Sequence, residues 1–246
     1  RTDLKILRSK LKPPRRKETL CRERLNQRFH NIRQMKLVTV VAGAGYGKTT
    51  FVSDALSFLD LNPGWYRLDE QDTDFQVFVS YLYSCYGKKM LPAPGLKKQD
   101  EILIEWLAFM EETLTGHTAF VLDDFHLVQQ SKPVMHAVEF ILDRLPAFLH
   151  LVIISRKDLP IKLSRLRAQD LLVEIDETGL CFTDSEVRSF FENGVDVVDT
   201  QIDDICSNTG GWAAGLVLVR YAMKNKHLGK ATVGLKNMTP APQLIS

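Results

Sequence analysis

The segment LVTVVAGAGYGKTT, residues 37–50, decides the fold class of this chain. It begins with an apolar, β-branched run, Leu37 to Ala42, that has no helical periodicity and leads directly into a glycine-rich stretch. Such a run is typical of a buried parallel strand, and we expect a helix to start near Lys48. The segment matches the phosphate-binding loop G-x-x-x-x-G-K-[ST] at every position except the first, where Ala42 replaces glycine. A glycine-rich turn with an incidental Lys-Thr pair is the alternative.

The composition of this loop suits a polyphosphate ligand. Because glycine has no Cβ, backbone N–H groups can approach an anion closely, and the N-terminus of the following helix favours negative charge. Lys48 would interact with the β and γ phosphates, and the Thr49 hydroxyl would coordinate Mg²⁺. We therefore predict that ATP or ADP, with Mg²⁺, binds the loop residues, which are Gly43, Ala44, Gly45, Tyr46, Gly47, Lys48, Thr49 and Thr50.

A second apolar run, Ala119 to Leu122, ends in two aspartates, Asp123 and Asp124. Ligands of open α/β sheets bind beyond the carboxyl ends of the strands, where this run delivers its carboxylate, and Asp124 is expected to point to the other side of the strand or its exit. Asp123 is predicted to bind, through water, the Mg²⁺ that Thr49 coordinates, and Asp124 to orient and deprotonate an attacking water. Aspartates also commonly cap strand ends, which is the alternative for this pair.

Arg156 follows a further apolar run, Leu149 to Ser155. We expect that strand to lie between the loop strand and the Asp123 strand, so that the guanidinium faces the third phosphate and stabilises charge there. A surface arginine at a strand end is the alternative. His126 is assigned no catalytic role. The acidic cluster at 69–74 is interpreted as a solvated turn and helix cap rather than a second metal site.

Strand-like and helix-like segments alternate between these motifs, which predicts an α/β fold with a parallel sheet covered by helices on both faces. Strands are expected at 65–68, 118–122, 149–154 and 171–175, and helices at 48–59, 75–86, 101–114 and 134–145. From Thr183, which has capping-box spacing to Glu186, the pattern is helical to about residue 225. We therefore expect a basic arm at 1–36, a P-loop core at 37–180, a small helical lid at 181–228 and a tail at 229–246.

Composition limits the class of protein. With 246 residues, 45% hydrophobic and 25% charged, the chain fits a soluble globular protein with one large domain and a satellite. No apolar run is long enough to span a membrane as a helix. The four cysteines include no CxxC pair, so neither a zinc site nor a disulfide framework is predicted, and a reducing cytoplasm is expected. The first residue is Arg and no signal peptide follows, which indicates a fragment or a processed chain.

The net charge of +2 conceals a basic N-terminal arm. Residues 1–36 contain 13 Lys or Arg against 3 acids, which leaves the rest of the chain at about −8. An anion-binding or nucleic-acid-binding tail is one interpretation. We favour the other, a solvated arm, extended at Pro13-Pro14, that wraps the domain and places one or two arginines near the nucleotide.

A series of motifs, in the same order as in a known family, extends over most of the chain. It resembles the ATPase domain of the MalT-like regulators, large LuxR-type transcription factors among the signal-transduction ATPases with numerous domains (STAND). The motifs are SKLKPPR (9–15), RERL (22–25), AGYGKTT (44–50), GWY (64–66), LDE (68–70), LDDFHL (122–127), SR (155–156), 163–168, FT (182–183) and GWAAGL (211–216).

The resemblance implies that Arg22, Arg24 and Leu25 border the adenine, and that the helical part carrying Trp212 closes over the nucleotide as a lid. It also implies an ATP-dependent switch domain of a signal-responsive transcriptional activator that hydrolyses ATP slowly and self-associates. The sensor repeats and DNA-binding domain of such regulators are absent from this sequence, so DNA would be bound only through such a domain. Gly43 occupies a position where relatives usually have proline, which is expected to leave the loop less rigid.

Two other functions remain open from the sequence. One is a nucleotide-binding scaffold with negligible hydrolysis that docks partner domains. The other is a P-loop kinase or motor-type ATPase acting on a separate substrate, although no acceptor-binding motif stands out. The rate of hydrolysis separates the switch from the scaffold.

Overall fold

The computed structural model of the chain describes residues 5–13, 20, 22–87, 98–192 and 198–224. Part of the predicted extension at Pro13-Pro14 and all of the predicted 229–246 tail lie outside these residues.

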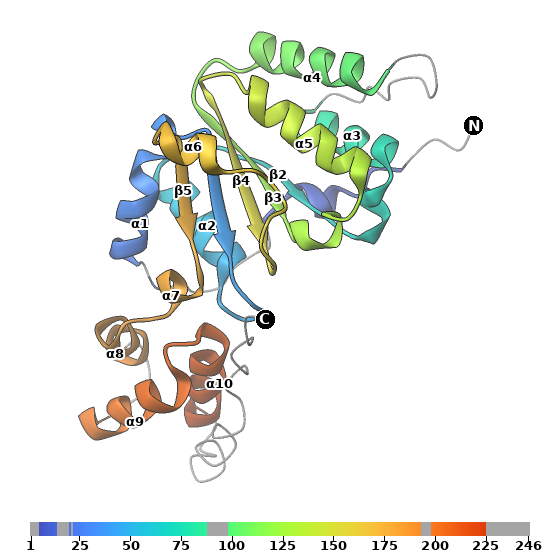
Figure 1. Cartoon of the computed structure of the whole chain (residues 1–246). Helices are drawn as coiled ribbons and strands as arrows, with labels where there is room; N and C mark the ends of the chain where they lie inside the picture. Colours follow the sequence, from blue (N-terminus) through green and yellow to red (C-terminus); the bar gives the residue numbers. More distant parts are fainter. Residues whose placement is uncertain (1–4, 14–19, 21, 88–97, 193–197, 225–246) are drawn as a thin grey trace.

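Five parallel strands form one sheet in the order β2-β3-β4-β1-β5 (Figure 1). The strands are β1 (Leu37–Val41), β2 (Gly64–Arg67), β3 (Thr118–Asp123), β4 (Leu149–Ser155) and β5 (Leu172–Ile175). Val41 pairs with Ser155, and Leu122 with Ile153, so the carboxyl ends of β1, β4 and β3 meet at one edge of the sheet. The predicted position of β4 between the loop strand and the Asp123 strand is confirmed.

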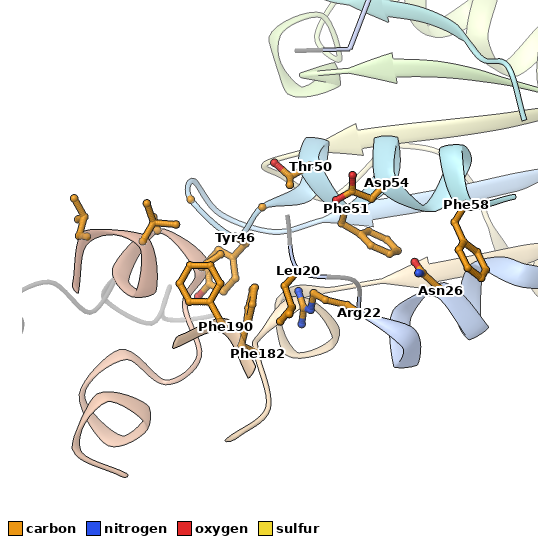
Figure 2. Close-up of a pocket in the computed structure, with 16 residues that line it drawn as sticks. Leu20, Arg22, Asn26, Tyr46, Thr50, Phe51, Asp54, Phe58, Phe182 and Phe190 are labelled. Carbon is orange, nitrogen blue, oxygen red and sulfur yellow. The ribbon is translucent and has the colours of Figure 1, made fainter. Parts of the chain in front are cut away.

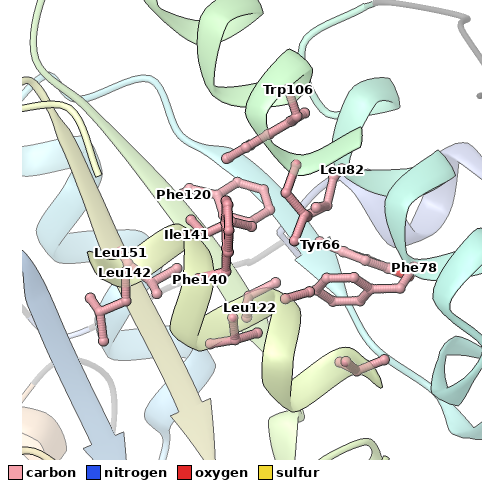
Figure 3. Close-up of a cluster of buried hydrophobic side chains, with 14 of the residues drawn as sticks. Tyr66, Phe78, Leu82, Trp106, Phe120, Leu122, Phe140, Ile141, Leu142 and Leu151 are labelled. Atoms are coloured by element: carbon pink, nitrogen blue, oxygen red, sulfur yellow. The ribbon is translucent and has the colours of Figure 1, made fainter. Parts of the chain in front are cut away.

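Helices cover both faces of this sheet, as predicted, because side chains along each strand alternate between two cores. One core lies against α3 (Phe75–Ser84), α4 (Gln99–Thr113) and α5 (Lys132–Arg144), where Tyr66, Trp106 and Phe120 are fully buried (Figure 3). The other lies against α1 (Glu23–His30) and α2 (Lys48–Phe58). Two short helices, α6 (Ser164–Ala168) and α7 (Glu177–Leu180), flank β5 in the chain.

The end of the described chain is helical, as predicted. Three helices, α8 (Asp184–Glu192), α9 (Asp199–Thr209) and α10 (Ala213–Lys224), enclose a small apolar core of their own that includes Val187, Phe191 and Leu216. We call residues 182–192 and 198–224 the helical segment. Gly211 has a φ of +74° and packs directly on the backbone of Phe182, so the turn before α10 has no room for a side chain.

The N-terminal arm is folded rather than solvated, which corrects our expectation. Its residues Leu25, Phe29 and Ile32 are fully buried, because α1 and the 3₁₀ turn after it, η2 (Asn31–Gln34), pack apolar side chains against the α2 face of the core. The residues between Arg8 and Leu11 form a 3₁₀ turn, η1, that contacts β2. Helix α1 was not predicted, because the many Lys and Arg residues of the arm indicated a solvated segment.

Lys10 anchors the arm in the acidic cluster. Its Nζ donates to Asp72 Oδ1 at 2.7 Å, lies 3.0 Å from Asp69 Oδ2 and sits 4.4 Å from the centre of the Tyr81 ring. Asp69 and Asp74 cap the turn η3 (Glu70–Thr73) and helix α3, as predicted for a turn and helix cap. Asp72, however, is fully buried, so the cluster is only partly solvated.

In the described ranges no helix is long and apolar enough to cross a membrane. The cysteines placed by the structure, Cys85, Cys181 and Cys206, are all free.

Candidate nucleotide-binding site

The glycine-rich loop joins β1 to α2 at the carboxyl edge of the sheet. Gly45 and Gly47 have φ values of +79° and +76°, a region that side chains rarely adopt, and α2 starts at Lys48 as predicted. The Lys48 ammonium donates to the carbonyl oxygens of Ala42 at 2.7 Å and Gly43 at 2.6 Å. Burial, and secondarily the nearby charge of Arg156, lowers the pKa of Lys48. The loop thus encloses a positive charge that would be stabilised by an anion.

Thr49 and Asp123 meet at the start of α2 and the end of β3. The Thr49 hydroxyl donates to Asp123 Oδ1 at 3.1 Å, and the Asp124 N–H donates to the same oxygen at 3.0 Å. Asp123 is fully buried, and its Oδ2 has no hydrogen-bond partner in the described part of the chain. Burial, reinforced by the charge of Asp124, raises the pKa of Asp123 to about 6. An orphaned buried carboxylate oxygen beside a hydroxyl fits a cation.

This donor set suits Mg²⁺, which keeps several waters and takes few protein ligands when it accompanies phosphates. Among the described residues, no group of three or more His, Cys, Asp or Glu side chains could hold a metal ion by itself. Any magnesium bound here would therefore depend on oxygens from a ligand and from water.

Asp124 and Arg156 face each other beyond the strand ends. The Arg156 Nε lies 3.8 Å from Asp124 Oδ1, and the two side chains are 51% and 29% exposed. Asp124 has a φ of +61°, so the chain turns sharply after Asp123 and directs the two neighbouring acids differently. One acid is sealed in the protein and the other reaches solvent. Nearby His126 has a pKa lowered mainly by burial.

A pocket of about 640 Å³ opens beside the loop (Figure 2). The loop contributes Gly45, Tyr46 and Gly47, and the face of α2 contributes Thr50, Phe51, Asp54 and Phe58. The opposite wall comes from the helical segment, through Phe182, Phe190, Ala213, Ala214, Val217 and Leu218, and the arm closes it with Leu20, Arg22 and Asn26. The walls are largely apolar and aromatic, which suits a flat ring system adjacent to a phosphate-binding loop.

The three arm residues that were expected to border a base differ in position. Arg22 lines the pocket, and its guanidinium lies 4.1 Å from the centre of the Phe182 ring. It also donates to the carbonyls of Leu180 at 2.8 Å and Cys181 at 2.7 Å, and pairs with Glu186 at 3.0 Å.

The other two arm residues lie outside the described lining of the pocket. Arg24 shares the Cys181 carbonyl with Arg22 at 3.0 Å. The Leu25 side chain is fully buried in the core.

Three contacts to the loop were not predicted from the sequence. Glu177, on α7, accepts a hydrogen bond from the Gly43 N–H at 2.7 Å. The Trp212 Nε1–H donates to the Ala44 carbonyl at 3.1 Å, and the Ala214 N–H donates to the Gly45 carbonyl at 2.9 Å. The GWAAGL motif had marked Trp212 as a lid residue, but an acid in the first turn of a helix, such as Glu177, gives no signal of its own.

Comparison with known proteins identifies relatives over most of the chain, although no protein-family model matches it. The HTH-type transcriptional regulator MalT of Cronobacter sakazakii is 33% identical over 236 residues, covering 89% of this chain and 25% of that regulator. The chain therefore spans a quarter of the length of this curated relative.

Solved structures show the same fold. A STAND protein with a tetratricopeptide repeat sensor from Pyrococcus horikoshii superimposes with a TM-score of 0.63 at 18% identity, over 93% of this chain and 34% of that one. A Walker-type ATPase of Pyrococcus abyssi gives 0.58 at 12% identity, over 88% and 71%. The chain is thus homologous to one quarter of the Cronobacter sakazakii MalT regulator, and it has the P-loop fold of the Pyrococcus horikoshii STAND protein.

Proposed function

We propose that this chain is the ATP-binding, slowly hydrolysing switch domain of a signal-responsive transcriptional activator. The observation that carries the proposal is the convergence of Lys48, the Thr49–Asp123 pair and the Asp124–Arg156 pair at one edge of the sheet, beside a 640 Å³ pocket. These are the groups that binding and hydrolysis of a nucleoside triphosphate require.

Binding divides between the loop and the pocket. The phosphates lie on the loop residues from Gly43 to Thr50, where Lys48 exchanges its contacts with loop carbonyls for contacts with phosphate oxygens. The base and ribose occupy the adjoining pocket. Arg22 and Phe182, already stacked on each other, form part of its wall. Arg156 reaches the third phosphate, so ATP and ADP differ in their contacts with it.

In hydrolysis, the adjacent acids Asp123 and Asp124 have different roles. Mg²⁺, held by Thr49 and Asp123, would neutralise charge on the phosphates. Asp124 orients and deprotonates the attacking water, because it is the acid of the pair that solvent reaches, whereas Asp123 is fully buried. Arg156 stabilises negative charge that develops next to Asp124.

The helical segment serves as the lid. It forms one wall of the pocket and is hydrogen-bonded to the loop, so a bound nucleotide contacts both the core and the lid. A ligand can shift an equilibrium between two lid positions only through different affinities for them. Because only ATP has a third phosphate, ATP and ADP would differ in how strongly each favours one lid position over the other.

The regulatory part of the proposal comes from the MalT-type homologue. Three quarters of that regulator lie outside the match, and we place the sensor repeats and the DNA-binding domain of this protein in such additional regions. We propose that the protein contacts DNA through that DNA-binding domain and not through this ATP-binding domain. The protein is then cytoplasmic, and ATP promotes its self-association.

Single-turnover hydrolysis of ATP by the purified chain tests this function. We expect slow Mg²⁺-dependent turnover, reduced about 10²–10⁴-fold by Asp124→Asn, with Mg·ATP still bound. Asp170→Asn is the matched control, because Asp170 also has a positive φ, +54°, but lies beyond α6, away from the loop. A parental chain that binds ATP without turnover would support the scaffold alternative. An Asp124→Asn variant with the parental rate would show that the base is elsewhere.

A further inference from the structure

The helical segment bonds to the outer side of the phosphate loop through two consecutive carbonyl groups. The Ala44 oxygen accepts from the Trp212 indole N–H at 3.1 Å, and the Gly45 oxygen accepts from the Ala214 N–H at 2.9 Å. The fit around Gly45 is tight. A Cβ at Gly45 would lie 2.8 Å from both the Trp212 ring and the Ala214 Cβ, so the loop and the segment are in direct contact.

These two bonds fix the direction of two peptide units. In a planar trans peptide the C=O and the N–H point in opposite directions, and no cis peptide occurs in the described part of the chain. Holding the Ala44 and Gly45 oxygens on the side of the segment therefore turns the N–H groups of Gly45 and Tyr46 to the other side. Neither N–H donates to any described backbone or side-chain acceptor.

We propose that Trp212 and Ala214 are positioning residues of the phosphate site, which hold the Gly45 and Tyr46 N–H groups ready for a polyphosphate anion. This inference rests on the proposed nucleotide-binding function and adds that the site is completed from outside the loop. Preorganised N–H groups bind an anion better than mobile ones, because no reorientation is needed on binding. The loop geometry and the position of the helical segment then depend on each other.

Two substitutions remove the donors one at a time. Trp212→Phe keeps an aromatic ring against Gly45 but has no N–H. Ala214→Pro removes the backbone donor at the second residue of α10, where proline is tolerated, as Pro133 is near the start of α5. Gln99→Pro is the matched control, because it adds the same constraint at the exposed first residue of α4, outside the pocket lining, and the Gln99 N–H has no acceptor among the described residues.

The affinities of ATP and inorganic tripolyphosphate for the whole chain are measured by competition against a fluorescent ATP analogue, a format that reaches millimolar affinities. Trp212→Phe and Ala214→Pro should each weaken both ligands about fivefold, equivalent to roughly 1 kcal/mol for one neutral hydrogen bond. Gln99→Pro should leave both affinities within about twofold of the parental values. Thermal unfolding identifies folded variants, and either donor variant alone suffices for the test.

The outcomes separate the inference from the function on which it rests. Parental affinities in the folded donor variants would overturn the positioning role. So would a loss confined to ATP, because the two residues would then act on the base pocket rather than on the loop. A parental chain that binds ATP but no tripolyphosphate would also overturn it. A parental chain that binds neither ligand would instead refute the proposed nucleotide-binding function.

Discussion

Replacing Asp123 with asparagine is expected to stabilise the ligand-free protein at neutral pH. The Asp123 carboxylate is fully buried, its Oδ2 lacks a partner in the described structure, and burial raises its pKa from 3.8 to about 6. At pH 7 the folded protein therefore holds a charge that its surroundings disfavour. Asparagine removes the charge and keeps an oxygen that can accept from the Thr49 hydroxyl and the Asp124 N–H, as Oδ1 does now.

The sign and size of the effect follow from proton linkage. Between about pH 4 and pH 6 the folded protein binds a proton at Asp123 that the unfolded chain has lost, so stability falls as pH rises through this window. The rise in the pKa of Asp123 from 3.8 to about 6 lowers the free energy of unfolding by at most about 3 kcal/mol. Above pH 6 the full loss is present, and Asp123→Asn should raise the melting temperature by roughly 5–10 °C.

Thermal unfolding followed by circular dichroism, at about pH 7.5 and about pH 4, provides the assay. The variant should melt higher than the parental protein at pH 7.5, and the two should converge near pH 4, where the parental carboxyl is neutral. Asp170→Asn, on the exposed surface, controls for a general effect of removing an acid. Adding Mg²⁺ with ATP should narrow the gap, because a cation compensates the carboxylate. A variant that melts at or below the parental temperature at pH 7.5 would refute the reasoning.

Three further predictions concern other charged residues. Lys48→Ala should weaken ATP binding at least tenfold in calorimetric titration, since each charge-assisted hydrogen bond is worth about 1.5–3 kcal/mol, and near-parental affinity in a folded variant would remove the phosphate-loop assignment. Arg156→Ala should lower ATP affinity about tenfold while ADP affinity hardly changes, and equal losses would make Arg156 structural. Lys10→Met should lower the free energy of unfolding by roughly 3 kcal/mol in denaturant titration, because Asp72 stays buried without its cation. The same change at exposed Lys12 should lower it hardly at all. Equally small losses in the two variants would contradict the anchoring role of Lys10.

The sheet and the loop were predictable because their signals are local. The β-branched run of β1 and the glycines after it specify a strand and a turn within fifteen residues, and the apolar run before Asp123 does the same for β3. The place of β4 between them came from the general architecture of P-loop ATPases. Element bounds differed by only one or two residues; for example, the helix expected from Glu101 starts at Gln99.

The missed features depend on residues far apart in the sequence. Lys10 and Asp72 are 62 positions apart, and Arg22 and Glu186 are 164 apart. Nothing in either local segment distinguishes a lysine that will be buried from one that remains in water, so the arm looked solvated. The same holds for Glu177, whose partner is a backbone N–H of the loop. A carboxylate that accepts from a backbone donor leaves no complementary side chain in the sequence.

The attachments of the helical segment differ in strength, and the difference predicts how it would move. On the arm side, the buried Arg22 guanidinium pairs with the Glu186 carboxylate of the segment, a charge-assisted bond of about 1.5–3 kcal/mol, and lies over the Phe182 ring. It also binds the carbonyls of Leu180 and Cys181, which come just before the segment and are thereby held to the arm. On the loop side, Trp212 and Ala214 make two neutral bonds of about 0.5–1.5 kcal/mol each. Opening at the loop therefore costs less than opening at the arm. The segment should pivot about Leu180 to Phe182, with its loop contacts breaking first, so that release of the segment also releases the two peptide units of the phosphate loop.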